Sequence, residues 1–131
     1  MKNNIFIIYF FLFYFFFFHV SANEKAFIRL EDKTKFIVDL AISSEEKKRG
    51  LMNINKLVNT NGMLFLYKKE RVVNMWMKNT HLDLAIIFIN TSKQILDIKV
   101  GFKFSKKIIS SNQPVIAILE IPSFCSKKLK L

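Results

Sequence analysis

The stretch NMWMKNTHLDLAIIFIN, from Asn74 to Asn90, decides the fold of this chain. A short segment around Trp76, the only tryptophan, leads into a polar turn at Lys78–His81 and then into an apolar run at Leu82–Ile89 that Asp83 alone interrupts. Because consecutive residues of this run are apolar, both of its faces have to be covered, as in the central strand of a sheet. The stretch therefore predicts a buried strand that is entered through a polar corner.

The rest of the chain after residue 22 has the strand and turn patterns of a small β domain. Two strand-like runs flank a polar turn at Glu31–Lys33, and an Asn61-Gly62 turn precedes a strand at Met63–Tyr67. An Asn90–Lys93 turn is typical of a hairpin that continues the central strand. These patterns predict a single, mainly β domain: a compact antiparallel β-sandwich or jelly-roll-like fold. In the remainder we expect a charged connection at 68–71, strands at 72–77, 94–100 and 114–121, and a loop with a short edge strand at 101–113.

One segment has a helical pattern. Ser43 and Glu46 have the spacing of a capping box, and Glu45 adds negative charge where the helix dipole is positive. Gly50 follows the basic residues 47–49 as a helix terminator. We predict one short helix of about two to three turns in this region.

The first 22 residues have the pattern of a signal peptide. Lys2 precedes an apolar core at Ile5–Phe18, and Val20-Ser21-Ala22 has the small residues that a signal peptidase recognises. The 14 residues of this core are fewer than the roughly 20 that span a bilayer as a helix. We therefore expect residues 1–22 to be a cleaved leader, and residues 23–131 to form one exported domain that is periplasmic or secreted. An uncleaved N-terminal membrane anchor is the alternative.

The net charge of +11 does not by itself indicate a nucleic-acid-binding protein. Only three of the 21 basic residues are arginine, the residue that most often forms paired hydrogen bonds with bases and phosphates. We expect no nucleic-acid partner and interpret the charge as a solvated basic surface; attraction to an anionic membrane or polymer is the alternative. Membrane attachment is expected only if the leader stays uncleaved.

Sequence motifs for catalysis, cofactors and metals are absent from the chain. The single cysteine, Cys125, cannot form an intramolecular disulfide and has no neighbouring histidine or acid. His81 and Cys125 alone cannot complete a zinc site, and no glycine-rich phosphate loop is present. We therefore expect no cofactor and no resident metal, and we favour a protein that is not an enzyme.

Two carboxylates interrupt otherwise apolar strands, Asp83 in LDLAIIFI and Glu120 in VIAILEI. Both are expected to be at least partly buried, and a buried carboxylate is costly unless it is paired or hydrogen-bonded. In the favoured interpretation, amides near Lys78–Thr80 bind Asp83, and Glu120 fixes a loop or pairs with a lysine. The alternative is a hydrolase or lyase that uses the two acids as a catalytic pair.

Four methionines lie near Trp76 and His81 in the sequence: Met52, Met63, Met75 and Met77. Thioether and imidazole ligands suit Cu(I), so a Cu(I)-handling protein is a further alternative. In a strand, however, Met75 and Met77 point away from Trp76, and methionine commonly fills gaps in a β core. We favour core packing for these residues.

Five short motifs follow one another between Phe36 and Ile121: Gly-Leu-Met after the helix, Gly-Met-Leu-Phe, Trp-Met-Lys-Asn-Thr, Leu-Asp before an apolar strand, and a late Leu-Glu. In this order they resemble the domain of unknown function 192 family. The resemblance implies a compact, mainly β domain, often behind an export signal, and it implies no activity. The characteristic positions that it implies are Gly50, Leu51, Met52, Gly62, Met63, Trp76, Met77, Lys78, Asn79, Thr80, Asp83 and Glu120.

Two features differ from the pattern of that family. Lys47 stands where the family usually has arginine. The family usually continues past its Leu-Glu with a glycine and a Gly-Asp segment, whereas this chain ends in PSFCSKKLKL. We therefore expect a domain that is shortened at its C-terminus.

The polar corner suggests a binding site at the mouth of the sandwich. Trp76 would form a stacking wall, and Lys78, Asn79 and Asp83 would be the polar groups of a shallow pocket for a small polar or glycan-like ligand. The alternative is that the corner only specifies the fold. We predict a non-catalytic binding or accessory protein of the cell envelope. Its candidate cluster is Met63, Trp76, Met77, Lys78, Asn79, Thr80, Asp83 and Glu120.

Overall fold

The computed structural model describes residues 24–29 and 33–128. The predicted leader, its cleavage near Ala22 and the alternative membrane anchor all lie outside the described residues. Within the described part of the chain, no helix has both the length and the apolar character needed to cross a bilayer.

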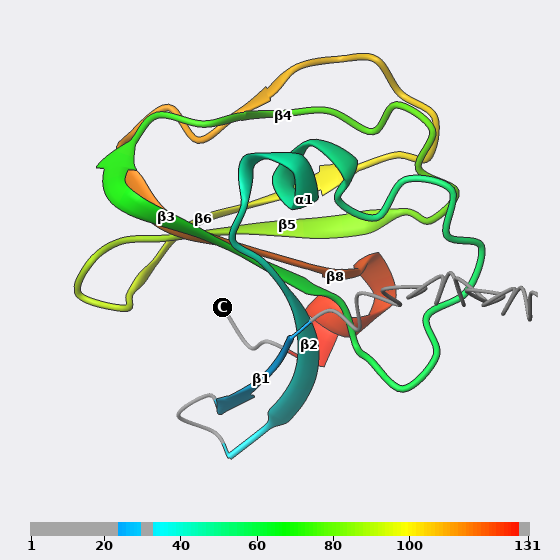
Figure 1. Cartoon of the computed structure of the whole chain (residues 1–131), viewed down its shortest axis with the longest axis horizontal. Helices are drawn as coiled ribbons and strands as arrows, with labels where there is room; N and C mark the ends of the chain where they lie inside the picture. Colours follow the sequence, from blue (N-terminus) through cyan, green and yellow to red (C-terminus); the bar gives the residue numbers. More distant parts are fainter. Residues whose placement is uncertain (1–23, 30–32, 129–131) are drawn as a thin grey trace, which may run out of the picture.

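Two sheets form most of the domain (Figure 1). The larger sheet has six strands in the order β1 (Lys25–Arg29), β2 (Lys35–Ala41), β3 (Met63–Arg71), β8 (Val115–Pro122), β5 (Leu84–Ile89) and β6 (Ile95–Gly101). The smaller sheet pairs β4 (Asn74–Met75) with β7 (Ile109–Ser110). Among the described residues, the one α-helix is α1 (Ser44–Arg49), and a 3-10 helix, η1 (Ser123–Lys128), follows β8. The prediction of a mainly β domain with one short helix is confirmed.

The neighbouring strands of the larger sheet are antiparallel except for β2 and β3. These two run parallel, with Asp39 opposite Met63 and Ala41 opposite Phe65. Parallel neighbours need a long crossover, and α1 with the loop that follows it supplies this crossover. This parallel pair differs from the predicted antiparallel fold. It is possible because α1 and its loop lie between β2 and β3 in the chain.

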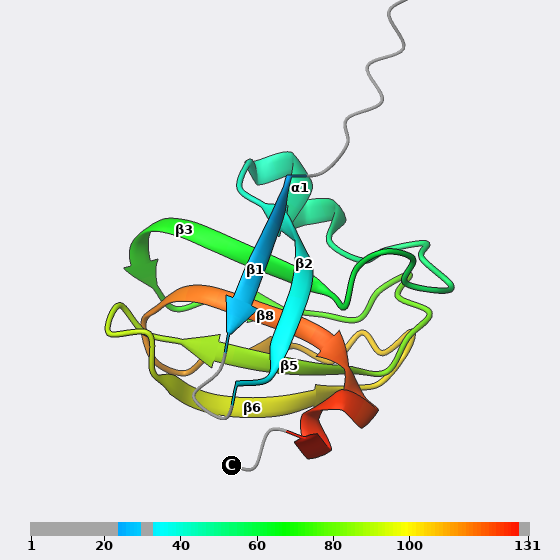
Figure 2. The same cartoon turned by 90° about the horizontal axis from the view of Figure 1, so that it is seen from below.

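Apolar residues are buried on both faces of the larger sheet. On the face toward α1 and the β4–β7 pair, Phe65 and Ile86 belong to one apolar cluster. On the opposite face, β1 and β2 cross over β8 and β5 (Figure 2), and Val38 and Ile87 belong to a second cluster. Cys125 of η1 packs against this second cluster. The sheet therefore separates two layers of core.

Strand β5 is the predicted central strand. It lies between β8 and β6, and each residue of Leu84–Phe88 is no more than 1% exposed. Its alternate side chains enter the two clusters on opposite faces. The prediction of a strand covered on both sides is confirmed.

Helix α1 begins with the predicted capping box. Ser43 Oγ accepts a hydrogen bond from the Glu46 amide at 3.1 Å, and Glu46 Oε2 accepts one from the Ser43 amide at 2.9 Å. Gly50 ends the helix with a φ of +48°, which glycine adopts at little cost. The helix has six residues, which is shorter than predicted, and none of them is buried. Its position therefore depends on its ends rather than on an apolar face.

Two boundaries differ from the expectations. Residues 68–71 continue β3 instead of forming a connection, and Arg71 pairs with Val115 after a register shift. This end of β3 is exposed, so charged side chains are tolerated in the strand. In segment 72–77, only Asn74 and Met75 are strand residues. Met77 instead fills the core beside Gly101, where a Cβ would collide with its thioether.

Gly62 lies where β3 begins beside β8. A Cβ at this position would overlap the backbone oxygen of Glu120, and a backbone atom cannot rotate away. We expect Gly62→Ala to lower the free energy of unfolding, measured by urea denaturation, by about 3 kcal/mol. The control is Asn55→Ala, which truncates an exposed loop residue. It should change the free energy of unfolding by less than about 0.5 kcal/mol. Equal stability of the two variants would contradict the importance of this close approach.

Candidate functional site

The predicted polar corner is a turn at Lys78 and Asn79. Asn79 has a φ of +54°, in the left-handed region that asparagine adopts more readily than most residues. The Thr80 amide donates to the Met77 carbonyl at 3.1 Å and closes the turn. The Asn53 amide donates to the Asn79 carbonyl at 2.8 Å. The corner is therefore joined to the loop that follows α1.

Residues 80 and 81 attach the corner to the loop between β6 and β7. The Phe104 amide donates to the Thr80 carbonyl at 3.0 Å. The rings of Phe104 and His81 meet edge to face, with centroids 4.8 Å apart. Thr80 is buried, and its hydroxyl donates to the Lys78 carbonyl. Thr80 therefore stabilises the corner and is not open to a ligand.

Asp83 lies at the surface, which corrects the expectation that it is at least partly buried. Its Oδ1 accepts a hydrogen bond from the Lys103 amide at 2.8 Å, and not from the amides of Lys78–Thr80. The cause is the hairpin of β5 and β6, in which Leu84 pairs with Gly101. This register places residue 83 beside the residues that follow β6, so Asp83 fixes the start of the β6–β7 loop.

A groove of about 660 Å³ lies between α1 and the polar corner. Trp76, Lys78 and Asn79 form one wall, whereas Asp83, the other polar residue of the predicted pocket, does not line the groove. The Trp76 side chain is 44% exposed, and Lys78 Nζ lies 5.1 Å from its ring centroid. The opposite wall is formed by Ser43, Glu45, Glu46, Lys48, Arg49 and Met52.

The groove combines a flat aromatic face with polar groups of both signs. Glu45, Lys48 and Lys78 are exposed and line it from opposite walls. Glu46 is already bound by backbone amides at the start of α1, chiefly that of Ser43, and these hydrogen bonds lower its pKa. The groups free to meet a ligand are thus two ammonium groups, one carboxylate, and the amide of the corner.

The helical wall of the groove was not identified as a site from the sequence. Glu45, Lys48, Arg49 and Met52 have the spacing i, i+3, i+4 and i+7, which places them on one side of a helix. This spacing is the signal that could have found them. It indicates a shared face only, because the opposite wall comes from a distant part of the chain.

Two of the four methionines near Trp76 in the sequence are core residues. Met63 and Met77 are buried in the apolar cluster beneath α1, and Met75 packs against it. Met52 lines the groove. The exposed His81 contacts Phe104, and the described part of the chain contains no group of three or more His, Cys, Asp or Glu that could hold a metal ion.

Glu120 lies in the centre of the larger sheet. It is directly opposite Met63 on β3 and Ile86 on β5, so its side chain shares their face, and it is 4% exposed. Burial raises the pKa of its carboxyl to about 8. Across residues 24–29 and 33–128, no hydrogen bond or ion pair reaches this carboxyl. The expected loop contact or lysine partner is therefore not found.

Asp83 and Glu120 do not share an open cleft. Asp83 is exposed and engaged by a loop amide, whereas Glu120 is enclosed by the apolar cluster beneath α1. Neither residue lines the groove beside Trp76. Catalysis by two carboxyl groups requires that both reach the same substrate, so this geometry gives no support to the hydrolase or lyase alternative.

Known proteins resemble this chain in sequence and in fold. The model of the DUF192 family, described as an uncharacterized ACR, matches residues 26–131. A solved structure from Sinorhizobium meliloti 1021, of a protein whose name suggests a transcription regulator, has a TM-score of 0.74 and 32% identity, covering 84% of this chain and 88% of that one. A protein of unknown function from Novosphingobium aromaticivorans DSM 12444 shares the fold, with a TM-score of 0.74, 24% identity, and coverage of 86% and 84%. No curated protein matches the chain.

The buried carboxyl of Glu120 should make stability depend on pH. Its pKa is raised from 4.5 to about 8, so between these values the unfolded chain loses a proton that the folded chain keeps. The free energy of unfolding therefore falls as the pH rises through this range. We expect Glu120→Gln to be more stable than the parent protein at pH 7 by up to about 3 kcal/mol, with no difference below about pH 4. Urea denaturation from pH 4 to pH 8 measures this difference.

Glu70→Gln is the control, because Glu70 is an exposed carboxyl at the end of β3. Its effect on the free energy of unfolding should be small and nearly independent of pH. If Glu120→Gln has the same effect at pH 4 and pH 8, burial does not keep this carboxyl protonated.

Proposed function

We propose that this chain, which belongs to the DUF192 family of unknown function, is a non-catalytic binding domain for a small polar, glycan-like ligand. The ligand would occupy the groove between α1 and the polar corner. The single observation that carries this proposal is the half-exposed Trp76 in a groove with polar side chains on both walls.

The composition of the groove suits a sugar better than a purely apolar molecule. A sugar ring has an apolar face of C–H groups, which packs on an aromatic ring, and a rim of hydroxyl groups, which needs donors and acceptors. Trp76 and Met52 offer the apolar surface, while Lys78, Asn79 and Glu45 offer donors and acceptors. A volume of about 660 Å³ is within the range of small-molecule sites.

The leader-like segment supports placing this binding domain outside the cytoplasm, in the periplasm or secreted. An N-terminal anchor at the membrane is the alternative location. In both cases we propose an accessory role in the cell envelope, where glycan-like ligands are abundant.

Binding is tested by tryptophan fluorescence, since the one tryptophan of the chain lies in the groove. Titration with glucose, N-acetylglucosamine and cellobiose should give a saturable change in Trp76 emission for at least one sugar. By calorimetry, Trp76→Ala should bind that sugar at least tenfold more weakly, a loss of about 1.4 kcal/mol.

The matched control is Phe27→Ala, which removes an aromatic side chain that is 82% exposed on β1, away from the groove. It should leave sugar affinity unchanged. Equal affinity of Trp76→Ala and the parent protein would show that the groove is not the binding site, and no response to any of the sugars would refute a glycan-like ligand.

A further inference from the structure

A second, larger cavity lies beside α1. It has a volume of about 1000 Å³ and is bordered by the end of β2, by α1 and by residues 67–72 of β3 and its continuation. Helix α1 contributes Lys47 to this cavity and Lys48 to the groove beside Trp76. The two hollows therefore use different basic side chains of the same short helix.

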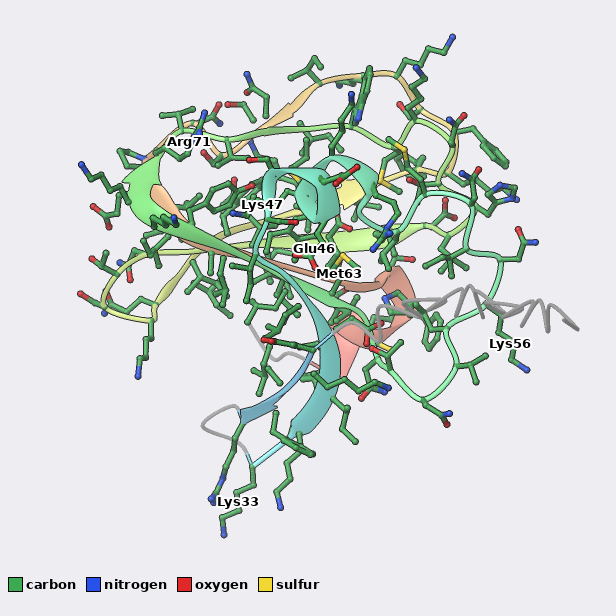
Figure 3. All side chains as sticks on the ribbon, in the orientation of Figure 1. Lys33, Glu46, Lys47, Lys56, Met63 and Arg71 are labelled. Carbon is green, nitrogen blue, oxygen red and sulfur yellow. The ribbon has the colours of Figure 1, made fainter. Side chains whose placement is uncertain are left out.

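The cavity gathers four basic side chains. Lys47, Lys68, Lys69 and Arg71 line it, and none of them takes part in a salt bridge within the described residues. Figure 3 shows Lys47 and Arg71 on the same side of the larger sheet, on α1 and at the end of β3. Burial, and then the charges of Arg71 and Lys68, lower the pKa of Lys47. These cations thus lie close enough to repel one another.

Lys47 is held in place rather than mobile in solvent. Its Nζ donates to the Ile42 carbonyl at 2.7 Å and lies 4.6 Å from the ring centroid of Tyr67. The Tyr67 hydroxyl has no hydrogen-bond partner in the described part of the chain, and burial raises its pKa, so it keeps its proton. The Lys47 and Tyr67 side chains therefore line the same hollow.

Three acidic residues also line the cavity, and the Glu46 charge acts on Lys47 by raising its pKa. The Glu46 carboxylate accepts hydrogen bonds from the Ile42 and Ser43 amides, and Glu70 Oε1 accepts one from the Thr91 amide. The third acid, Glu24, is exposed at the start of β1. The four cations of the lining thus exceed its three carboxylates by one positive charge.

We propose that this cavity binds a small phosphate-bearing molecule, with Lys47 and Arg71 holding the phosphate and Tyr67 donating a hydrogen bond. An arginine fork pairs with two phosphate oxygens, and lysine supplies a point charge to the third. A phosphate dianion balances several converging cations, whereas a carboxylate needs only one. This site uses other cations than the groove beside Trp76, although Ser43 and Glu46 line both hollows.

The proposal is tested by isothermal titration calorimetry with inorganic phosphate and pyrophosphate at pH 7.5 and low ionic strength. We expect saturable binding that Lys47→Gln and Arg71→Gln each weaken at least tenfold. Arg71 is exposed, so its variant should fold even if Lys47→Gln does not. Lys56→Gln removes the same charge at a distant, exposed position (Figure 3) and should weaken binding less than twofold.

Three results would overturn the proposal. If Lys56→Gln and Arg71→Gln lose the same amount of phosphate affinity, phosphate is attracted to the basic protein as a whole and not to this cavity. Acetate binding as tightly as phosphate would indicate a carboxylate site. Loss of phosphate binding in Lys78→Gln, with Arg71→Gln unaffected, would place the anion in the groove beside Trp76. Sugar binding measured through Trp76 should be the same in Arg71→Gln and the parent protein, so the two sites can fail separately.

Discussion

The pairing of β8 with both β3 and β5 is the interaction on which the rest of the domain depends. Because β8 is central, the sheet needs cover on both faces. Strands β1 and β2 with η1 cover one face, and the β4–β7 pair with α1 covers the other. Helix α1 is a small part of this cover, with six residues and none buried. Both hollows lie along this helix, so the candidate sites follow from a short helix set over a wide sheet.

Local patterns predicted the local elements of this fold. The apolar run of β5 and the Ser43–Glu46 capping box each depend on residues close in sequence, and both are found as expected. The parallel pairing of β2 and β3 and the central place of β8 depend on contacts between distant segments. No periodicity within a strand encodes which strand will lie beside it. The same limit explains Asp83, whose hydrogen-bond partner Lys103 is brought to it by the β5–β6 hairpin.

The motif around Trp76 contains residues of two kinds. Trp76, Lys78 and Asn79 face the groove, whereas Met77 and Thr80 are buried and hold the corner together. A sequence motif does not separate these roles, because adjacent residues in a turn point in different directions. The other wall of the groove could be predicted only as a helical face, since its partner is set by the fold. The position of the α1 wall opposite Trp76 therefore could not be predicted from the sequence.

The central place of β8 also affects the order in which the protein can fold during synthesis. Strands β3 and β5 leave the ribosome before residues 115–122, which separate them in the sheet. Until then each has an unpaired edge of backbone N–H and C=O groups, and pairing between such distant segments is intrinsically slow. The β1–β2–β3 part and the β5–β6 part of the sheet cannot join until β8 has been synthesised. The edges of β3 and β5 that face each other in the sheet therefore stay exposed until β8 is available to pair with both.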